Sequence, residues 1–148
     1  MTNIPIEILL VEDSPTDALL TKSALGEAQL LGRLSHVEDG EKAMAFLRKE
    51  PPYADAPRPH LILLDLNMPR KDGREVLAEI KADEDLRSIP VVILTTSRAE
   101  EDVMQAYQLH ANCYIAKPVD YISFKEAMST LKVFWFKVIR LPSAGSPK

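Results

Sequence analysis

The sequence lacks several features that would point directly to a function. Its one cysteine, Cys113, cannot form an internal disulfide and is better explained as a buried structural thiol than as a reactive one. There are five glycines in 148 residues, and neither G-x-G-x-x-G nor G-x-x-x-x-G-K-[ST] occurs, which argues against a nucleotide-binding cradle. The hydrolase motif G-x-S-x-G is also absent. His36, His60 and His110 show no metal-ligand spacing, and we interpret them as structural or surface residues.

An excess of positive charge is missing as well. The chain has 18 basic and 22 acidic residues, a net charge of −4, which argues against nonspecific binding to nucleic acid or an anionic membrane. No apolar run approaches the roughly 20 residues that cross a bilayer. The segment Met1 to Pro5 does not resemble a signal peptide. We therefore expect a cytoplasmic protein.

Five short apolar segments alternate with longer amphipathic ones, and this pattern predicts a doubly wound α/β domain with a parallel sheet. The predicted strands are Ile6–Val11, Leu34–Glu38, Leu61–Leu64, Val91–Leu94 and Cys113–Ala116. Helix-start signals occur at Ser14-Pro15, Asp72–Glu75, Ser97–Glu100 and Asp120. The length suits one domain, residues 1–148, with a core from about residue 6 to 139.

Two segments interrupt this alternation. Residues 49–60 contain four prolines, which predicts an extended loop between the second helix and the third strand. The segment 141–148 is small, polar and proline-bearing, and we expect it to be flexible.

Ligands of an open parallel sheet bind outside the carboxyl ends of its strands. The residues at those ends are Glu12, Asp13, Asp65, Thr95 and Lys117. Three carboxylates at one edge repel each other, and an all-oxygen donor set without His or Cys favours Mg²⁺. A lysine ammonium and a threonine hydroxyl suit the oxygens of a phosphoryl group carried on a carboxylate. Any one of these acids alone is better read as a turn or cap residue, but their convergence with Lys117 favours a site.

Four segments resemble the signatures of the bacterial response-regulator receiver family. They are VEDS at 11–14, LLDLNMPRKDG at 63–73, ILTTS at 93–97 and IAKP at 115–118, and the resemblance extends from residue 6 to about 139. It implies the flavodoxin-like strand order 2-1-3-4-5 with five flanking helices. It also implies a phosphorylation-dependent switch in a two-component system, with enzymatic activity limited to its own phosphorylation and dephosphorylation. Because the sequence leaves no room for a second domain after the last expected helix, we expect no output domain.

The resemblance assigns a role to each matching residue. Asp65 matches the phosphoacceptor, while Glu12 and Asp13 match the acidic pair that holds Mg²⁺, for which Mn²⁺ can substitute. Asn67 matches the position whose backbone carbonyl binds the metal. Thr95 and Lys117 match the switch hydroxyl and the phosphate-binding lysine. Tyr114 matches the aromatic residue that moves inward with Thr95, although a half-buried aromatic on the last strand is the alternative interpretation.

Features that are less specific than these four signatures suggest a subgroup of the family and partners for the protein. The proline-rich loop and the aromatic ending resemble the stand-alone receivers encoded beside bacterial and cyanobacterial phytochromes, which would make a light-sensing histidine kinase the phosphodonor. Phe134, Trp135 and Phe136 make the end of the last expected helix apolar on more than one side. We expect them to form a homodimer contact, although packing beneath the loop or tail would also explain them.

Two other kinds of function remain open at this point. One is a hydrolase or phosphatase of similar fold that uses an aspartyl-phosphate intermediate, but Asn67 stands where such enzymes usually need a second acid. The other is a binding module that works without phosphorylation, which the intact set of site residues argues against.

Overall fold

The computed structural model describes residues 7–27, 33–66, 68, 73–95 and 113–116, together with residues 122 and 126, which are both helical. The elements follow in the order β1 (Glu7–Val11), α1 (Pro15–Glu27), β2 (Arg33–Val37), α2 (Gly40–Leu47), β3 (Leu61–Asp65), α3 (Gly73–Ala82), β4 (Val91–Thr95) and β5 (Cys113–Ala116). All strands pair in parallel in the order β2-β1-β3-β4-β5, which confirms the predicted sheet. Most of the two expected C-terminal helices and the segment 141–148 lie outside the described residues.

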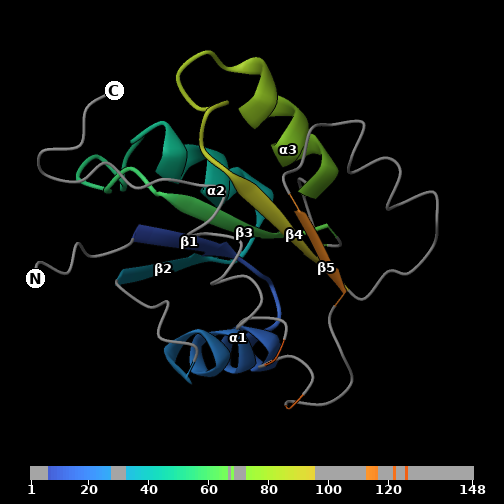
Figure 1. Ribbon diagram of the computed structural model, residues 1–148. Helices are drawn as coiled ribbons and strands as arrows, with labels where there is room; N and C mark the ends of the chain where they lie inside the picture. The colour runs from blue at the N-terminus through green and yellow to red at the C-terminus, as the bar shows by residue number, and fades with distance from the viewer. Residues whose placement is uncertain are drawn as a thin grey trace, which may run out of the picture.

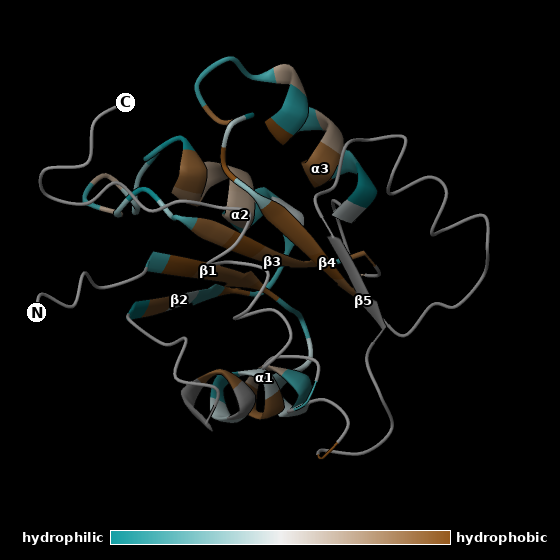
Figure 2. Cartoon of the chain, in the orientation of Figure 1, coloured by the Kyte–Doolittle hydropathy of each residue, from teal (hydrophilic) through white to brown (hydrophobic). Residues whose placement is uncertain are grey.

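The central strands are apolar because both of their faces are covered. Figure 1 shows α1 on one face of the sheet and α2 and α3 on the other. Alternate strand residues pack with α2 and α3 in one core cluster; they are Leu9, Val11, Ile62, Leu64, Val91 and Ile93. The residues between them point to the opposite face and are equally buried; they are Ile8, Leu10, Leu61, Leu63, Val92 and Leu94. In Figure 2, β1, β3 and β4 are mostly brown, the colour of hydrophobic residues, because both faces of these strands are buried.

Two helix starts show how the local sequence sets the element boundaries. The Ser14 hydroxyl oxygen accepts a hydrogen bond from the Asp17 amide at 3.2 Å, and α1 begins at Pro15, as the sequence predicts. The Asp39 carboxylate accepts from the Lys42 amide at 2.9 Å and caps α2, a start that our sequence reasoning missed. Both caps lie just beyond the carboxyl ends of β1 and β2. Among the described residues, no helix is long and apolar enough to cross a membrane.

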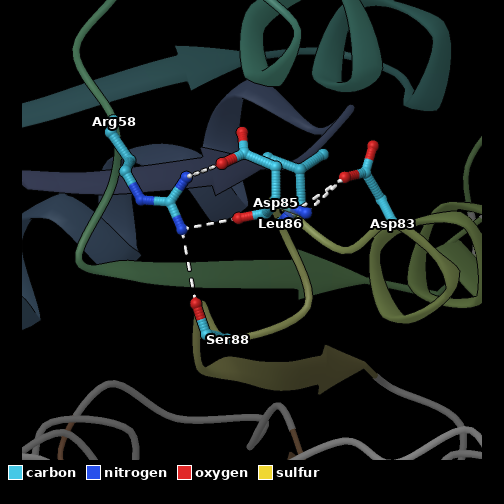
Figure 3. Close-up of polar contacts among 5 residues, drawn as sticks. All are labelled: Arg58, Asp83, Asp85, Leu86 and Ser88. Carbon is cyan, nitrogen blue, oxygen red and sulfur yellow. Dashed lines mark hydrogen bonds and ion pairs between the residues drawn. The ribbon is translucent and has the colours of Figure 1, made fainter.

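The proline-rich loop contains no helix or strand, as predicted, but it is fastened at several points. The ring of Tyr53 packs on Phe46 of α2 with centroids 5.6 Å apart. The Arg58 guanidinium donates to the Asp85 carbonyl at 2.7 Å and to the Ser88 hydroxyl at 3.3 Å, and it pairs with the Asp85 carboxylate at 3.5 Å (Figure 3). We call this group of three residues the Arg58 clamp. It ties the loop before β3 to the connection between α3 and β4.

Candidate functional site

Three carboxylates meet where β1 and β3 end. Glu12 and Asp13 follow β1 directly, Asp65 is the last residue of β3, and the two strands are neighbours in the sheet. One carboxylate oxygen from each residue lies within 4.8 Å of the other two. Glu12 and Asp65 are 1% and 5% exposed, whereas Asp13 is open to solvent. The convergence that the sequence predicts for these three acids is therefore present.

The backbone around Glu12 is held by β2 and by the start of α1. The Glu12 amide donates to the Val37 carbonyl at 3.0 Å, which extends the pairing of β1 with β2 by one residue. The Glu12 carboxylate accepts from the Ser14 amide at 3.2 Å. Ser14 in turn caps α1, so the chain turns directly from the acidic pair into a helix. Asp13 lies between these two anchored residues.

Asp65 is fixed from the other side by Gly73, the first residue of α3. The Gly73 amide donates to the Leu66 carbonyl at 2.9 Å. A Cβ atom at position 73 would overlap the Asp65 carbonyl oxygen and lie 2.7 Å from the Leu66 Cα. Only glycine lets the start of α3 approach the backbone of Asp65 so closely. The sequence pattern at Asp72–Glu75 predicts a helix start here, but it does not predict the close approach of Gly73 to Asp65. A glycine at a helix start gives no indication of which backbone packs against it.

The donor set of this acidic cluster fits a hard divalent cation. Two unit charges about 4 Å apart repel by roughly 4 kcal/mol at an effective dielectric constant of 20, so three carboxylates at such distances favour a bound cation. Carboxylate oxygens are the ligands that Mg²⁺ and Mn²⁺ accept, and neither His nor Cys contributes to this cluster of described residues. The exposure of Asp13 leaves one side of the cluster accessible to water and to a further oxygen ligand.

The remaining predicted residues are described in part or not at all. Thr95 ends β4, and its backbone is in register with Ala116 of β5, the residue before Lys117. Tyr114 is in register with Ile93. The side chains of Thr95, Tyr114 and Cys113 lie outside the described part of the chain, as do His110, Asn67, Lys117 and the aromatic residues Phe134, Trp135 and Phe136. Their roles stay predictions.

Comparisons with known proteins agree with this geometry. Residues 8–129 match the family model of the response regulator receiver domain. The chain is 48% identical over 143 residues to the response regulator Rcp1 of Synechocystis sp., covering 97% of each protein. It is 47% identical to the phosphorylated cyanobacterial phytochrome response regulator RcpA, with a TM-score of 0.87 over 95% of this chain and 100% of that one. The Mn²⁺-bound form of Rcp1 gives 47% identity and a TM-score of 0.85, over 94% and 100% of the two chains.

The match covers most of the sequence, and it includes the strands that carry the acidic cluster. The fold, the strand order and the position of the three carboxylates all agree with it. The chain therefore belongs to the response regulator receiver family, whose members are phosphoacceptor switches in two-component signalling rather than enzymes acting on a separate substrate.

Proposed function

We propose that Asp65 is the residue that accepts the phosphoryl group. The observation that carries this proposal is the position of Asp65 at the end of β3, with carboxylate oxygens of Glu12 and Asp13 within 4.8 Å. The Asp65 carboxylate attacks the phosphorus of a phosphohistidine or of acetyl phosphate, and the bond from phosphorus to the leaving imidazole or acetate breaks as the aspartyl phosphate forms. The backbone of Asp65 is held for this reaction by its pairing with β4 and by Gly73. The similarity to a receiver named as phosphorylated supports the same chemistry here.

The cation of the site is Mg²⁺ in this proposal, and Mn²⁺ can replace it. Glu12, Asp13 and Asp65 would hold it together with the backbone carbonyl of Asn67. Asp13, the exposed acid, would be the more direct ligand, and Glu12 would act through water. When bound, the cation would neutralise phosphoryl oxygens beside these carboxylates. The similarity to an Mn²⁺-bound Rcp1 supports an oxygen-ligated divalent ion.

Thr95 and Lys117 complete the site in this account. Thr95 at the end of β4 donates a hydroxyl hydrogen bond to the phosphoryl group, and Lys117 after β5 supplies a positive charge. Movement of Thr95 leaves room for Tyr114 to rotate inward. This alters the surface formed by the fourth helix, β5 and the fifth helix, which is how a local charge change becomes a signal.

The partner is a sensor histidine kinase, and we propose a bacterial or cyanobacterial phytochrome as that kinase. The similarity to RcpA, described as a cyanobacterial phytochrome response regulator, supports this choice. Such a kinase takes its phosphoryl group from ATP, so we place the protein in the cytoplasm. We further propose that residues 1–148 act as one receiver domain and form a homodimer through Phe134, Trp135 and Phe136.

The phosphoacceptor is tested by incubation with acetyl phosphate and Mg²⁺ followed by intact mass measurement. The parent protein gains one phosphoryl group, and Asp65→Asn gains none. Asp85→Asn, which removes a carboxylate at the opposite edge of the sheet, serves as the matched control and reacts like the parent. Phosphorylation of Asp65→Asn at the parental rate would refute the assignment.

The dimer and the switch are tested by sedimentation at several protein concentrations. Beryllofluoride, a phosphoryl mimic, shifts the dimer dissociation constant of the parent, and Thr95→Ala reduces the shift. Equal association with and without the mimic would contradict the proposed coupling while leaving Asp65 as the phosphoacceptor.

A further inference from the structure

A histidine side chain of β2 contacts the backbone of the acidic pair. His36 is in register with Leu10 of β1, and its half-buried ring extends along β1 to the residue that follows the strand. Its Nε2 atom lies 2.8 Å from the Glu12 carbonyl oxygen. A carbonyl oxygen can only accept, so the ring nitrogen donates the hydrogen bond.

This contact is one of several hydrogen bonds that hold Glu12, and three of them involve its amide, its carboxylate and its carbonyl. The Glu12 amide donates to the Val37 carbonyl, the Glu12 carboxylate accepts from the Ser14 amide, and the Glu12 carbonyl accepts from His36. The carbonyl of Glu12 belongs to the peptide unit that links it to Asp13. A donor fixed on that oxygen restricts rotation of the peptide plane, which sets the direction in which Asp13 leaves the end of β1.

We propose that His36 is a positioning residue for the metal ligands. By holding the Glu12 carbonyl, it keeps the Asp13 carboxylate within reach of the oxygens of Glu12 and Asp65. The inference rests on the proposed cation site, and it assigns a role to a residue that the sequence alone marks as structural or surface. Groups that orient metal ligands without touching the metal commonly affect affinity by about tenfold or more.

A second histidine provides a control at the other end of β1. The His60 ring accepts from the Glu7 amide at 3.0 Å, and the His60 amide donates to the Glu7 carbonyl at 2.7 Å. Both histidines thus bind the backbone at an end of the same strand, but Glu7 stands at the start of β1 and Glu12 follows its end. If His36 served only to hold β1 in the sheet, removing either ring would have the same effect on the metal site.

The test measures Mg²⁺ and Mn²⁺ affinity by calorimetry for four variants of the full chain. His36→Leu keeps an apolar side chain but lacks the donor, and we expect about a tenfold loss of affinity. His36→Gln places an amide nitrogen near the position of Nε2 and restores most of the affinity. His60→Leu binds the metal like the parent, and Asp13→Asn binds it weakly. Thermal unfolding without metal identifies any variant that has lost its fold. If His36→Leu does not fold, the affinity of His36→Gln decides the test.

Three results would overturn the proposal. These are parental affinity in His36→Leu, an affinity of His36→Gln as low as that of a folded His36→Leu, or an equal loss in His60→Leu. Asp13→Asn separates the failure of this inference from the failure of the cation site. If Asp13→Asn binds weakly and His36→Leu binds normally, only the role of His36 is refuted, whereas parental affinity in Asp13→Asn refutes the site and the inference together.

Discussion

The two ends of the parallel strands, which form the carboxyl edge and the opposite edge of the sheet, arrange their charged residues in opposite ways. At the carboxyl edge, Glu12, Asp13 and Asp65 bring three carboxylates within 4.8 Å of one another. At the other edge, the Arg58 clamp places a guanidinium between acceptors on Asp85 and Ser88 (Figure 3). A cavity of about 490 Å³ opens beside this clamp, and its lining contains charges of both signs, namely Arg48, Lys49, Arg58, Asp83 and Asp85.

This difference separates a structural use of charge from a functional one. Around the Arg58 clamp, opposite charges neutralise each other and join a loop to the start of β4, so they need no ligand. At the carboxyl edge, charges of one sign are held together by the backbone of two strands, which costs folding free energy until a cation binds. The clamp has a cavity beside it, but the acidic cluster has the stronger preference for one kind of ligand, a cation. Substitutions at the two edges should therefore have different consequences.

Gly73→Ala should have the largest effect on stability, because the new Cβ would overlap the backbone of Asp65. Forcing an atom into a packed site costs roughly 3 kcal/mol, which urea unfolding measures. The displaced Asp65 should also weaken metal binding. Glu75→Ala, in the same first turn of α3 but exposed, is the control and should change both quantities little. Parental stability in Gly73→Ala would show that the start of α3 does not fix Asp65.

Asp13→Asn should stabilise the metal-free protein by about 1 to 2 kcal/mol, because it removes repulsion from two neighbouring carboxylates that water partly screens at the exposed Asp13. The same substitution should weaken Mg²⁺ binding, so stability and function change in opposite directions. Asp85→Asn at the clamp weakens an ion pair and should lower stability slightly without affecting the metal. Urea unfolding with and without Mg²⁺ measures the stability and the metal binding of both variants. A destabilised Asp13→Asn would contradict the contrast between the edges.

Arg58→Ala should lower the free energy of unfolding by about 1 kcal/mol, because it removes two hydrogen bonds and an ion pair from a partly exposed side chain. Metal affinity should stay at the parental value, since the clamp lies at the edge away from the acidic cluster. Arg58→Lys, which keeps the charge but loses the planar fork, should recover only part of the stability. A change in metal affinity would mean that the two edges are coupled.

Lys81 should produce the smallest effect, visible only in the pH dependence of stability. Its ammonium donates to the carbonyls of Arg87 and Ile89, and burial lowers its pKa below the ordinary 10.5. Between the lowered pKa and 10.5, the unfolded chain holds a proton that the folded chain has lost, so the stability of the parent rises with pH in that window. Lys81→Arg does not titrate there. The parent should therefore gain stability relative to this variant as the pH approaches 10.5, and a constant difference would contradict the shift.

The sequence predicted those features of the site that follow from strand ends. Burial on both faces makes β1, β3 and β4 visible as apolar runs, and the residues after such runs must meet at one edge of a parallel sheet. Glu12, Asp13 and Asp65 were found in this way. Gly73 and His36 could not be, because their roles depend on contacts across the chain. The contact of His36 with Glu12 requires the register of β1 with β2, and hydrophobic periodicity does not specify that register.

The central claim, that the carboxyl edge of the sheet is a cation-dependent phosphoacceptor site, is tested most directly by chemical trapping. An acyl phosphate is reduced by borohydride, which would convert a phosphorylated aspartate to homoserine and mark its position for peptide mass spectrometry. After treatment with acetyl phosphate and Mg²⁺, we expect homoserine at position 65 alone, and none when the cation is removed by a chelator. Homoserine at position 13, 2-amino-5-hydroxypentanoic acid (the product from a phosphorylated glutamate) at position 12, or homoserine at position 65 regardless of the cation would contradict this assignment.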